Sequence, residues 1–422
     1  MSFVDLNQEA MVVHRENNGK LATIGKAKLT DAHDLAILYT PGVAEPCRAI
    51  EKEEDLSFEL TMRGNCVAVI SDGTRVLGLG NIGAAAAMPV MEGKSILYKT
   101  FGDIDSVPVC LDTQDKDEFI KTVKILQKNY AGINLEDIQS PKCYDIEDAL
   151  KTELDIPVFH DDQHGTAIIC AAAVLGALRY VKKDIGEVKV VLSGAGAAGT
   201  AICRLLLDLG VKNMIMLNSK GAMYEGMDMS RVNRVQAELL KRTNREKFQG
   251  DLAACAKGAD VLLGVSSAGL FTQEIIKSMN KDAIVFAMAN PVPETSYQAA
   301  KEAGAAVAGT GRSDAPNQVN NVSVFPGIFR GALDVRARAI NEEMKQAAAR
   351  AVASIIPDEE LRDDYVVPPV FDERVAPAVA AAVAKAAMDT GVARIKVDPE
   401  VIRQRTLERI RKNHANAAKV LE

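Results

Sequence analysis

Runs of β-branched and other apolar residues alternate with longer stretches of helical periodicity along the chain from about residue 66 onward. This alternation is typical of βαβ units, in which helices join parallel strands. In the first half of the chain, the short apolar runs predict strands at residues 66–70, 107–111, 132–138 and 157–159. We therefore expect a parallel sheet in this half.

A second series of apolar runs predicts another parallel sheet. Between the two series, residues 166–182 (TAIICAAAVLGALRYVK) are strongly apolar and rich in alanine, which predicts a buried helix that connects two domains, with Thr166 as its N-cap. Five buried-type strands separated by helix-length segments are typical of a doubly wound domain. We expect these strands at residues 188–193, 213–218, 259–266, 283–290 and 305–310.

The charged, alanine-rich segments from about Leu333 to the end predict helices that pack back across both domains or onto a partner subunit. A chain of 422 residues exceeds what one hydrophobic core usually organises. We therefore expect an α/β fold in three parts: an N-terminal domain with parallel strands at residues 1–160, a doubly wound, Rossmann-type domain at 161–370, and a C-terminal helical segment at 371–422.

Composition narrows the possible functions. The net charge of -7 and the dispersed basic residues argue against nucleic-acid binding, which needs a clustered basic face. The first residues carry no positive stretch followed by an apolar one, and the small apolar run at residues 375–387 is too short to span a bilayer, so we expect no membrane partner and a cytoplasmic location. Seven scattered cysteines without a CxxC pair indicate reduced thiols.

A glycine-rich turn predicts a dinucleotide site. Gly194, Gly196 and Gly199 have GxGxxG spacing directly after a predicted strand and at the start of a helix, where backbone N–H groups and the helix dipole favour a pyrophosphate. The next strand ends in Asn218, followed by Lys220, where an acid would indicate NAD, so NAD and NADP both stay open. The expected cofactor-binding residues are Gly194, Ala195, Gly196, Ala197, Ala198, Gly199 and Asn218.

Acidic residues follow each predicted strand of the first half. Ligands of parallel α/β sheets bind beyond the carboxyl ends of the strands, so these acids are placed to converge on one crevice. We interpret Asp72 and Asp112 as turn or capping residues. The acids that remain as candidates for chemistry are Glu136, Asp137, Asp161 and Asp162.

Six separate motifs follow one another along the chain from about residue 30 to about residue 330. They are YTPGVAEPC around Tyr39, SDGTRVLGLGNIG from Ser71, MEGKSILYKTFGDIDSVPVCLDT around Lys94, the two acid pairs, FAMANPVPE from Phe286 and GTGRSDAPNQVNNVSVFPG from Gly309. In this order they resemble the malic enzymes. The resemblance implies oxidative decarboxylation of malate to pyruvate and CO₂ with NAD or NADP, and decarboxylation of oxaloacetate as a further activity.

The resemblance also implies a role for each matching residue. Lys94 matches the general base and Tyr39 the general acid, while Asp161 matches the acid that accompanies the lysine. Family members of this length commonly form homodimers, so we expect a homodimer and no phosphotransacetylase-like domain of the kind found in some bacterial relatives. Arg75, Asn290, Asn320 and Asn321 match residues that line the substrate and nicotinamide, and Glu136, Asp137 and Asp162 match the metal ligands.

This chemistry accounts for the residue types. Three carboxylates are hard oxygen ligands, which favour Mg²⁺ or Mn²⁺ over Zn²⁺. A divalent cation stabilises the enolate that forms when CO₂ leaves, and Tyr39 would then protonate C3 of enolpyruvate. A lysine acts as a base near neutrality if its pKa falls to roughly 7 to 8, as burial and a neighbouring cation allow.

Other hypotheses compete with this one. The HDDQH sequence suggests zinc bound by His160 and His164, but Gly165 and the preceding strand argue against one helix across both histidines. An amino-acid dehydrogenase would share the domain order and a catalytic lysine, although it needs no cluster of metal-binding acids. A non-catalytic dinucleotide sensor would not need Tyr39, Lys94 and the acids together.

Overall fold

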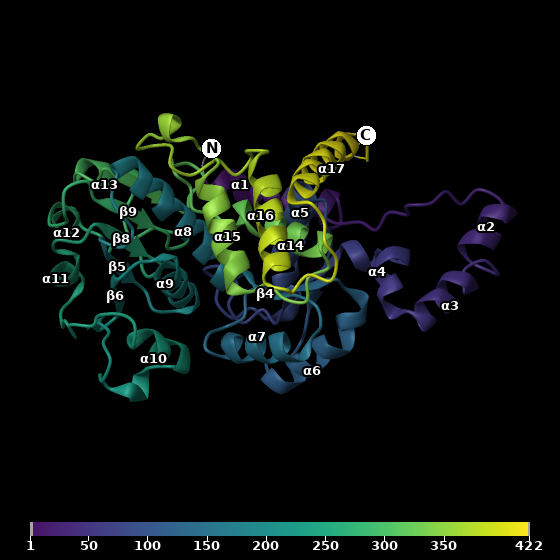
Figure 1. Ribbon diagram of the computed structural model, residues 1–422, viewed down its shortest axis with the longest axis horizontal. Coiled ribbons are helices and arrows are strands. Elements are labelled where there is room, and N and C mark those ends of the chain that lie inside the picture. The colour runs from purple at the N-terminus through teal and green to yellow at the C-terminus, as the bar shows by residue number, and fades with distance from the viewer. Residues whose placement is uncertain (1–2, 421–422) are drawn as a thin grey trace.

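The computed structural model describes residues 3–420 and contains two sheets in two bodies, the first parallel throughout and the second parallel except for one edge strand (Figure 1). The first sheet has the strand order β2-β1-β3-β4, and all its pairings are parallel. The central strand β1 is buried along its whole length, as a strand covered on both faces must be. The predicted first sheet is confirmed, with strands β1 (Cys66–Ser71), β2 (Asp105–Cys110), β3 (Gly132–Leu135) and β4 (Val158–His160).

Helices join these strands and cover the sheet. The 20-residue helix α5 runs between β1 and β2 and packs on both of them. Ala84 and Ala87 of its alanine-rich start are buried, as are Met91 and Tyr98 further along the helix. The helices of this body are α1 (Phe3–Glu16), α5 (Gly83–Gly102), α6 (Lys116–Leu126) and α7 (Lys142–Glu153).

The second sheet has the order β10-β9-β8-β5-β6-β7, which confirms the doubly wound, Rossmann-type domain. The order reverses between β5 and β8, where such folds bind their ligand. The short strand β7 (Gly221–Ala222) pairs antiparallel with β6 and was not predicted, because two residues leave no periodic pattern. The other strands are β5 (Lys189–Ser193), β6 (Asn213–Asn218), β8 (Val261–Gly264), β9 (Ile284–Ala287) and β10 (Val307–Thr310).

Helices of modest length separate the strands of this second sheet. The longest of them follows β5 directly, so its N-terminus faces the carboxyl end of that strand. The helices are α9 (Ala197–Leu209), α10 (Arg234–Leu240), α11 (Leu252–Ala256), α12 (Gln273–Lys277) and α13 (Tyr297–Glu302).

The connecting helix α8 (Asp161–Val181) begins five residues earlier than predicted. The expectation that Thr166 caps it was wrong, since the N-cap is His160 and Gly165 lies inside the helix. A Cβ at Gly165 would lie 1.8 Å from Oδ1 of Asp161, so glycine here makes room for that carboxylate rather than ending the helix. Helix α8 has the length and hydropathy of a membrane span, but 67% of that window is buried inside the protein, as in a core helix.

The C-terminal helices pack back across both domains, as predicted. Helix α14 contacts α5 of the first body, while α15 contacts α8 and α9. A Cβ at Gly331 would lie 2.4 Å from the Ala380 carbonyl oxygen, so α14 and α16 approach each other closely. These helices are α14 (Phe325–Asp334), α15 (Glu342–Ala353), α16 (Val375–Asp389) and α17 (Pro399–Val420).

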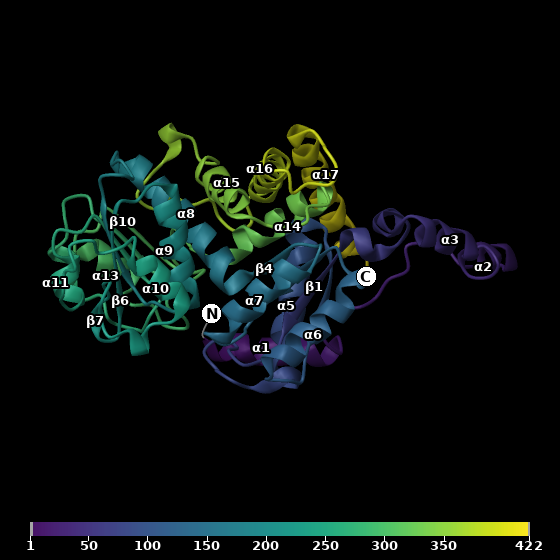
Figure 2. The same ribbon diagram turned by 60° about the horizontal axis from the view of Figure 1, so that its bottom comes forward.

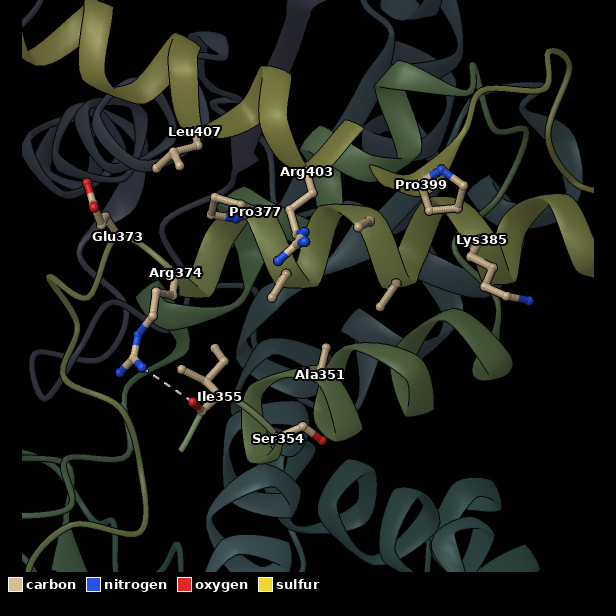
Figure 3. A pocket seen from close by; sticks show the side chains of 13 residues that line it. Ala351, Ser354, Ile355, Glu373, Arg374, Pro377, Lys385, Pro399, Arg403 and Leu407 are labelled. Carbon is tan, nitrogen blue, oxygen red and sulfur yellow. Dashed lines mark hydrogen bonds between the residues drawn. The ribbon is translucent and has the colours of Figure 1, made fainter. Parts of the chain in front are cut away.

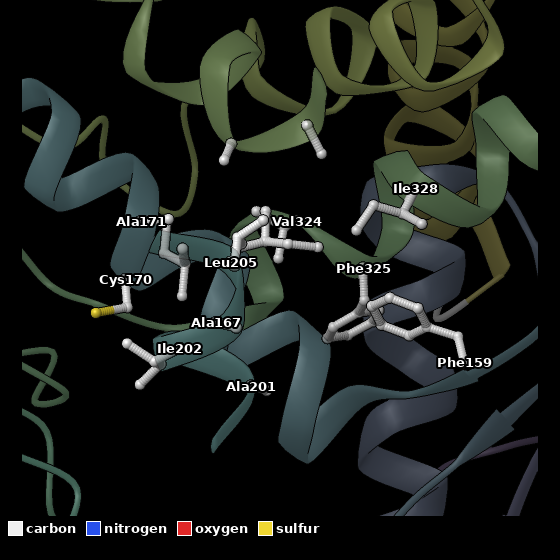
Figure 4. Packing of buried hydrophobic residues seen from close by; sticks show 14 of the residues in the cluster. Phe159, Ala167, Cys170, Ala171, Ala201, Ile202, Leu205, Val324, Phe325 and Ile328 are labelled. Carbon is white, nitrogen blue, oxygen red and sulfur yellow. The ribbon is translucent and has the colours of Figure 1, made fainter. Parts of the chain in front are cut away.

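One apolar cluster connects the two bodies. Figure 4 shows Phe159 and Phe325 on one side of the cluster, and Ala167 of α8 beside Ile202 and its neighbours on α9 on the other. The small side chains of α8 let the surrounding helices approach it closely. The relative position of the two sheets therefore depends on packing against α8.

An arm formed by α2 (Ala32–Leu38) and α3 (Ala44–Lys52) projects from the first body in both views (Figures 1 and 2). The short helix α4 (Ser57–Leu60) joins it to the sheet. Neither α2 nor α3 buries a residue. Apolar side chains of the arm are instead exposed, namely Leu29, Leu35, Ile37, Leu38, Tyr39 and Val43.

Candidate active site

Lys94 is the centre of a buried charge cluster at the carboxyl end of the first sheet. It lies on α5, is 8% exposed, and its Nζ is 2.9 Å from Oε1 of Glu136, which follows β3. The same Nζ donates to Oδ2 of Asp161, the first residue of α8. The ammonium also lies 4.2 Å from the ring centroid of Phe325. The fold thus gathers a lysine and two acids from three distant segments.

An asparagine pair completes the cluster. Nδ2 of Asn321 donates to Oδ2 of Asp161 at 2.6 Å. Nδ2 of Asn134, in the middle of β3, donates to Oε2 of Glu136 at 2.8 Å. Asn134 was not predicted as a site residue, although its spacing of two from Glu136 places both on one face of an extended strand.

The cluster shifts the pKa values of its members. Burial, together with the Glu136 carboxylate, raises the pKa of Asp161 to about 7, against the opposing effect of Lys94. Burial by itself lowers the pKa of Lys94, but Asp161 and Glu136 outweigh it and hold the pKa above its usual value. The two carboxylates thus act on the pKa of Lys94 in the opposite direction from the neighbouring cation that the expectation of a lowered pKa requires.

The three predicted metal ligands lie beside this cluster. Asp137 follows Glu136 directly, and its N–H donates to Oδ2 of Asp162 at 2.8 Å. Burial, followed by the charges of Asp162 and Glu136, raises the pKa of Asp137 to about 8. Oδ2 of Asp137 and Oδ1 of Asp161 are buried without a hydrogen-bond partner. Unsatisfied acidic oxygens of this kind suit a hard divalent cation.

The side chains are not arranged as a finished ligand set. Among the residues that the structure describes, no three His, Cys, Asp or Glu side chains are placed to hold one metal ion. The Lys94 ammonium forms ion pairs with one carboxylate oxygen of Glu136 and one of Asp161. The donor chemistry fits Mg²⁺ or Mn²⁺, but a bound ion would require Glu136, Asp137 and Asp162 to turn towards one point.

The other predicted substrate residues differ in their surroundings. Arg75 is exposed, and its N–H donates to the Asp137 carbonyl at 3.0 Å, which places this residue beside the acids. Asn290 is exposed just beyond β9, across from the first sheet. Oδ1 of Asn320 accepts the Val322 N–H at 3.1 Å, so Asn320 caps the helical turn that carries Asn321.

The predicted glycine turn has the shape that a pyrophosphate needs. Gly194 has a φ of +110°, and a Cβ there would lie 2.6 Å from the Val265 carbonyl oxygen. A Cβ at Gly199 would lie 1.8 Å from the Gly194 carbonyl oxygen, whereas the space beside Gly196 is open. Gly196 is the N-cap of α9, whose first residues are Ala197 and Ala198, so the helix N-terminus faces this space.

The far end of the dinucleotide site carries no acid. Oδ1 of Asn218, the last residue of β6, accepts the Lys220 N–H at 2.9 Å. This bond fixes the asparagine in a turn and leaves its amide group as a donor. A ribose 2′-hydroxyl and a 2′-phosphate can both accept from it.

Tyr39 does not join the cluster within one chain. It is the C-cap of α2 on the projecting arm and is 67% exposed, whereas Lys94 is buried in α5. Figures 1 and 2 both show α2 at the far end of the arm, away from α5. The structure therefore separates the two residues that the resemblance pairs as acid and base.

Models of two protein domains match consecutive parts of the chain. The malic enzyme N-terminal domain matches residues 18–151, and the malic enzyme NAD binding domain matches residues 163–388. The chain belongs to the malic enzyme family. This membership rules against the amino-acid dehydrogenase hypothesis.

Similar malic enzymes match over nearly the whole chain. A bifunctional malic/malolactic enzyme of Bacillus subtilis is 55% identical and covers 96% of this chain and 98% of its own length. An NADP-dependent malic enzyme of Salmonella typhimurium is 47% identical over 92% of this chain, which spans only 53% of that relative. A malic enzyme structure from Pyrococcus horikoshii has a TM-score of 0.94 at 45% identity and covers 98% of both chains.

A polar network behind the malic enzyme acids was missed from the sequence. Glu147 of α7 is buried and accepts from Nε2 of His164 at 2.7 Å and from Lys151 at 2.5 Å. Lys345 of α15 lies 3.1 Å from Nδ1 of His164. His160 is the N-cap of α8 while His164 lies in its first turn, so the two histidines do not share a helix and the zinc hypothesis loses its basis.

An apolar groove of about 610 Å³ lies elsewhere, between α15, α16 and α17 (Figure 3). Ala351, Pro377 and Leu407 line it, and Arg374 and Arg403 lie at its sides. None of its lining residues belongs to the Lys94 cluster or to the glycine turn.

The polar network makes a testable prediction about pH. Burial, aided by the cations Lys345 and Lys151, lowers the pKa of His164 to about 4, while an unfolded histidine keeps a pKa near 6.5. Between these values only the unfolded chain takes up the proton, so the free energy of unfolding falls as the pH falls from about 6.5 to about 4. The His164→Gln variant should lose this contribution, which is at most about 1.4 kcal/mol per pH unit.

Urea denaturation of both proteins at several pH values between 7.5 and 4.5 measures the difference. The wild type should lose stability more steeply than the variant over this range. Equal slopes for the two proteins would contradict a neutral, buried His164.

Proposed function

We propose that this chain is a cytoplasmic enzyme that oxidises and decarboxylates L-malate to pyruvate and CO₂ while reducing NAD or NADP. The observation that carries the proposal is the buried contact of Lys94 with Glu136 and Asp161 at the carboxyl ends of the first sheet. Burying three ionisable groups together is costly, and such clusters are common at active sites. This one lies at the carboxyl end of a parallel sheet, where α/β folds bind their ligands. Decarboxylation of free oxaloacetate would use the second half of the same reaction.

Lys94 is the proposed general base for the hydroxyl proton at C2 of malate. Its carboxylate neighbours hold the pKa of Lys94 above the usual value, so the ammonium must give up a proton before it can act as a base. Asp161 is the proposed acceptor, since it contacts Nζ directly. A divalent cation bound beside these groups would favour this transfer, because a nearby positive charge lowers the pKa of a lysine.

The remaining polar residues are proposed to orient substrate and nicotinamide. Arg75 can bind a malate carboxylate with its guanidinium fork, and its backbone bond to Asp137 keeps it near the acids. Asn321 holds Asp161 and can also face substrate. Asn290, at the end of β9, extends from the opposite sheet, and Asn320 supports Asn321 as a cap.

Glu136, Asp137 and Asp162 are the proposed ligands of Mg²⁺ or Mn²⁺. The ion would supply Lewis-acid stabilisation of the negative charge on the substrate oxygen as CO₂ leaves. The partnerless oxygen of Asp137 and its raised pKa support this assignment, because a cation would satisfy the oxygen and favour its charged form.

We further propose that the enzyme is a homodimer in which the arm of one subunit brings Tyr39 to the active site of the other. Tyr39 is 67% exposed in the single chain, and the arm around it exposes apolar side chains such as Leu35 and Ile37. A helix whose apolar side chains face water gains stability when a second chain covers them. In that position Tyr39 would protonate C3 of enolpyruvate.

A surface beside the site can receive the arm. The loop after β1 lies against the loop after β9. A Cβ added to Gly78 of the first loop would lie 3.3 Å from Cδ of Pro291 in the second, so the two bodies meet there. Leu77, Leu79 and Val292 of these loops are all more than half exposed. An apolar patch next to Arg75 and Asn290 is where a partner's Tyr39 would need to arrive.

Replacing the proposed base tests the reaction. The Lys94→Ala variant should reduce kcat by about 10²-fold or more, because general acid–base catalysis commonly contributes that much. Binding of NADH, followed by its fluorescence, should change little. As a matched control, the Lys99→Ala variant removes a partly exposed lysine of the same helix, paired with Asp103 and remote from the cluster, and should keep activity. Unchanged turnover in Lys94→Ala would contradict its assignment as the base. Unchanged turnover after thorough chelation with EDTA would contradict the role of the metal.

Mixing two inactive variants tests the shared site. Tyr39→Phe and Lys94→Ala proteins, dissociated together and reassembled, should form heterodimers with one intact site, since one chain supplies Lys94 and the other Tyr39. Random pairing at equal amounts predicts about a quarter of wild-type activity. If both residues act within one chain, the mixture stays inactive, and a chain that is monomeric in solution would contradict the dimer directly.

A malolactic activity is a second candidate function, favoured by the 55% identity to the bifunctional enzyme of B. subtilis. In this reaction malate is oxidised, CO₂ leaves, and the hydride returns from the reduced coenzyme to C2 of pyruvate, so lactate forms with no net reduction. With coenzyme far below the malate concentration, lactate should accumulate in excess of NADH. Pyruvate and NADH formed in equal amounts without lactate would leave only the first activity.

A further inference from the structure

Glu294 is a fully buried carboxylate with an unusual set of partners. Its side chain is 0% exposed, and its hydrogen-bond donors among the described residues are backbone N–H groups and one hydroxyl. Oε1 accepts the Ser266 N–H at 2.7 Å and the Ser266 hydroxyl at 3.1 Å, while Oε2 accepts the Ala289 N–H at 3.0 Å. Three donors thus offset the cost of burying this charge without a cation.

These bonds join three strand ends of the second sheet. Ser266 lies just beyond β8, and Ala289 lies just beyond β9. The Ser266 hydroxyl also lies 3.0 Å from the hydroxyl of Ser193, the last residue of β5 and the neighbour of Gly194. One carboxylate therefore connects the glycine turn, the β8 loop and the β9 loop.

The chain makes room for this carboxylate. A Cβ on Gly264 would lie 2.4 Å from Cδ of Glu294, so no other residue fits there without displacing the acid. The backbone around Glu294 also holds the β8 loop, because its carbonyl accepts the Phe271 N–H at 3.0 Å. The Pro293 carbonyl accepts the Gly269 N–H at 3.2 Å.

The joined loops lie where the coenzyme is expected. In doubly wound sheets the pyrophosphate binds at the first βα turn, and the two halves of the dinucleotide extend to either side of the switch point. Strand β6 with Asn218 lies on one side of β5, whereas β8 and β9 lie on the other. The loops fixed by Glu294, including Asn290 beside Ala289, therefore border the nicotinamide half.

We propose that Glu294 is a positioning residue for the coenzyme, which holds the loops after β8 and β9 in the arrangement that receives the nicotinamide. The inference rests on the dinucleotide site of the proposed function. Glutamate is required here because both of its oxygens accept from N–H groups. Glutamine keeps the size but turns an NH₂ group towards one of those donors.

The test compares Glu294→Gln with wild type. The variant should raise the KM for the coenzyme, and the Kd for NADH from fluorescence titration, by about 10- to 100-fold, the range for losing hydrogen bonds to a charged group. The KM for malate should change clearly less than the coenzyme constants, because Lys94 and Arg75 lie in the first body and only Asn290 among the proposed substrate residues lies in a loop that Glu294 holds. If Glu294 only stabilised the fold, the variant would have a lower melting temperature, but its KM for the coenzyme would not rise more than its KM for malate.

Asp260→Asn is the matched control. Asp260 is a buried acid at the opposite end of β8, where it accepts from the Lys189 N–H at 2.9 Å and from Lys183 at 2.8 Å. It should lower stability and leave the coenzyme KM unchanged. If Glu294→Gln does not fold, Ser266→Ala tests the same link, because it removes the hydroxyl that joins Glu294 to Ser193, and it should raise the coenzyme KM.

The proposal is overturned if the coenzyme constants of folded Glu294→Gln match those of wild type, or if Asp260→Asn shifts them equally. An unchanged coenzyme KM in Ser266→Ala would overturn it where Glu294→Gln is unfolded. If wild-type protein fails to bind NADH, the proposed function is overturned as well. Binding by wild type therefore distinguishes a failure of the Glu294 proposal from a failure of the proposed function.

Discussion

The contact of the Lys94 ammonium with Glu136 and Asp161 is the constraint on which the rest of the structure depends. Charges removed from water are tolerated only when each has partners close by. This requirement accounts for the amide of Asn134 beside Glu136 and for Asn321 beside Asp161. It also accounts for the absence of a side chain at Gly165, where a Cβ would strike the Asp161 carboxylate.

The cluster draws its members from α5, the end of β3 and the start of α8, so the packing of these elements sets its geometry. Helix α8 has a double role. Its apolar length packs along α9 and α15, and its first turn presents two acids to the site. The network of Glu147, His164 and Lys345 ties that same turn to α7 and α15. A shift between the two sheets would therefore move the acids relative to the glycine turn.

Lys94 and Tyr39 lie in opposite environments within one chain. The body surrounds Lys94 with partners, whereas the arm holds Tyr39 in water among exposed apolar side chains. The proposed general acid therefore lies far from the Lys94 cluster of its own chain. In the proposed homodimer, the partner subunit covers the apolar arm, and the arm brings Tyr39 to the partner's active site. One association thus accounts for both the exposed apolar side chains and the distance between Tyr39 and Lys94.

The sequence by itself determined the elements whose signals are local. Runs of β-branched residues placed nine strands within a few residues, and GxGxxG after a strand located the dinucleotide turn, because these patterns depend on neighbouring residues alone. Acids after strands predicted a crevice, since parallel strands bring their carboxyl ends to one edge.

Only the tertiary structure decided the rest. It placed the start of α8 at Asp161, brought Glu136 and Asp161 against the Lys94 ammonium, held Tyr39 on an exposed arm and connected three strand ends through Glu294. Each of these results depends on contacts between segments far apart in the chain, or on their absence. Patterns of neighbouring residues do not predict such contacts, because burial and charge pairing arise only when distant segments pack together.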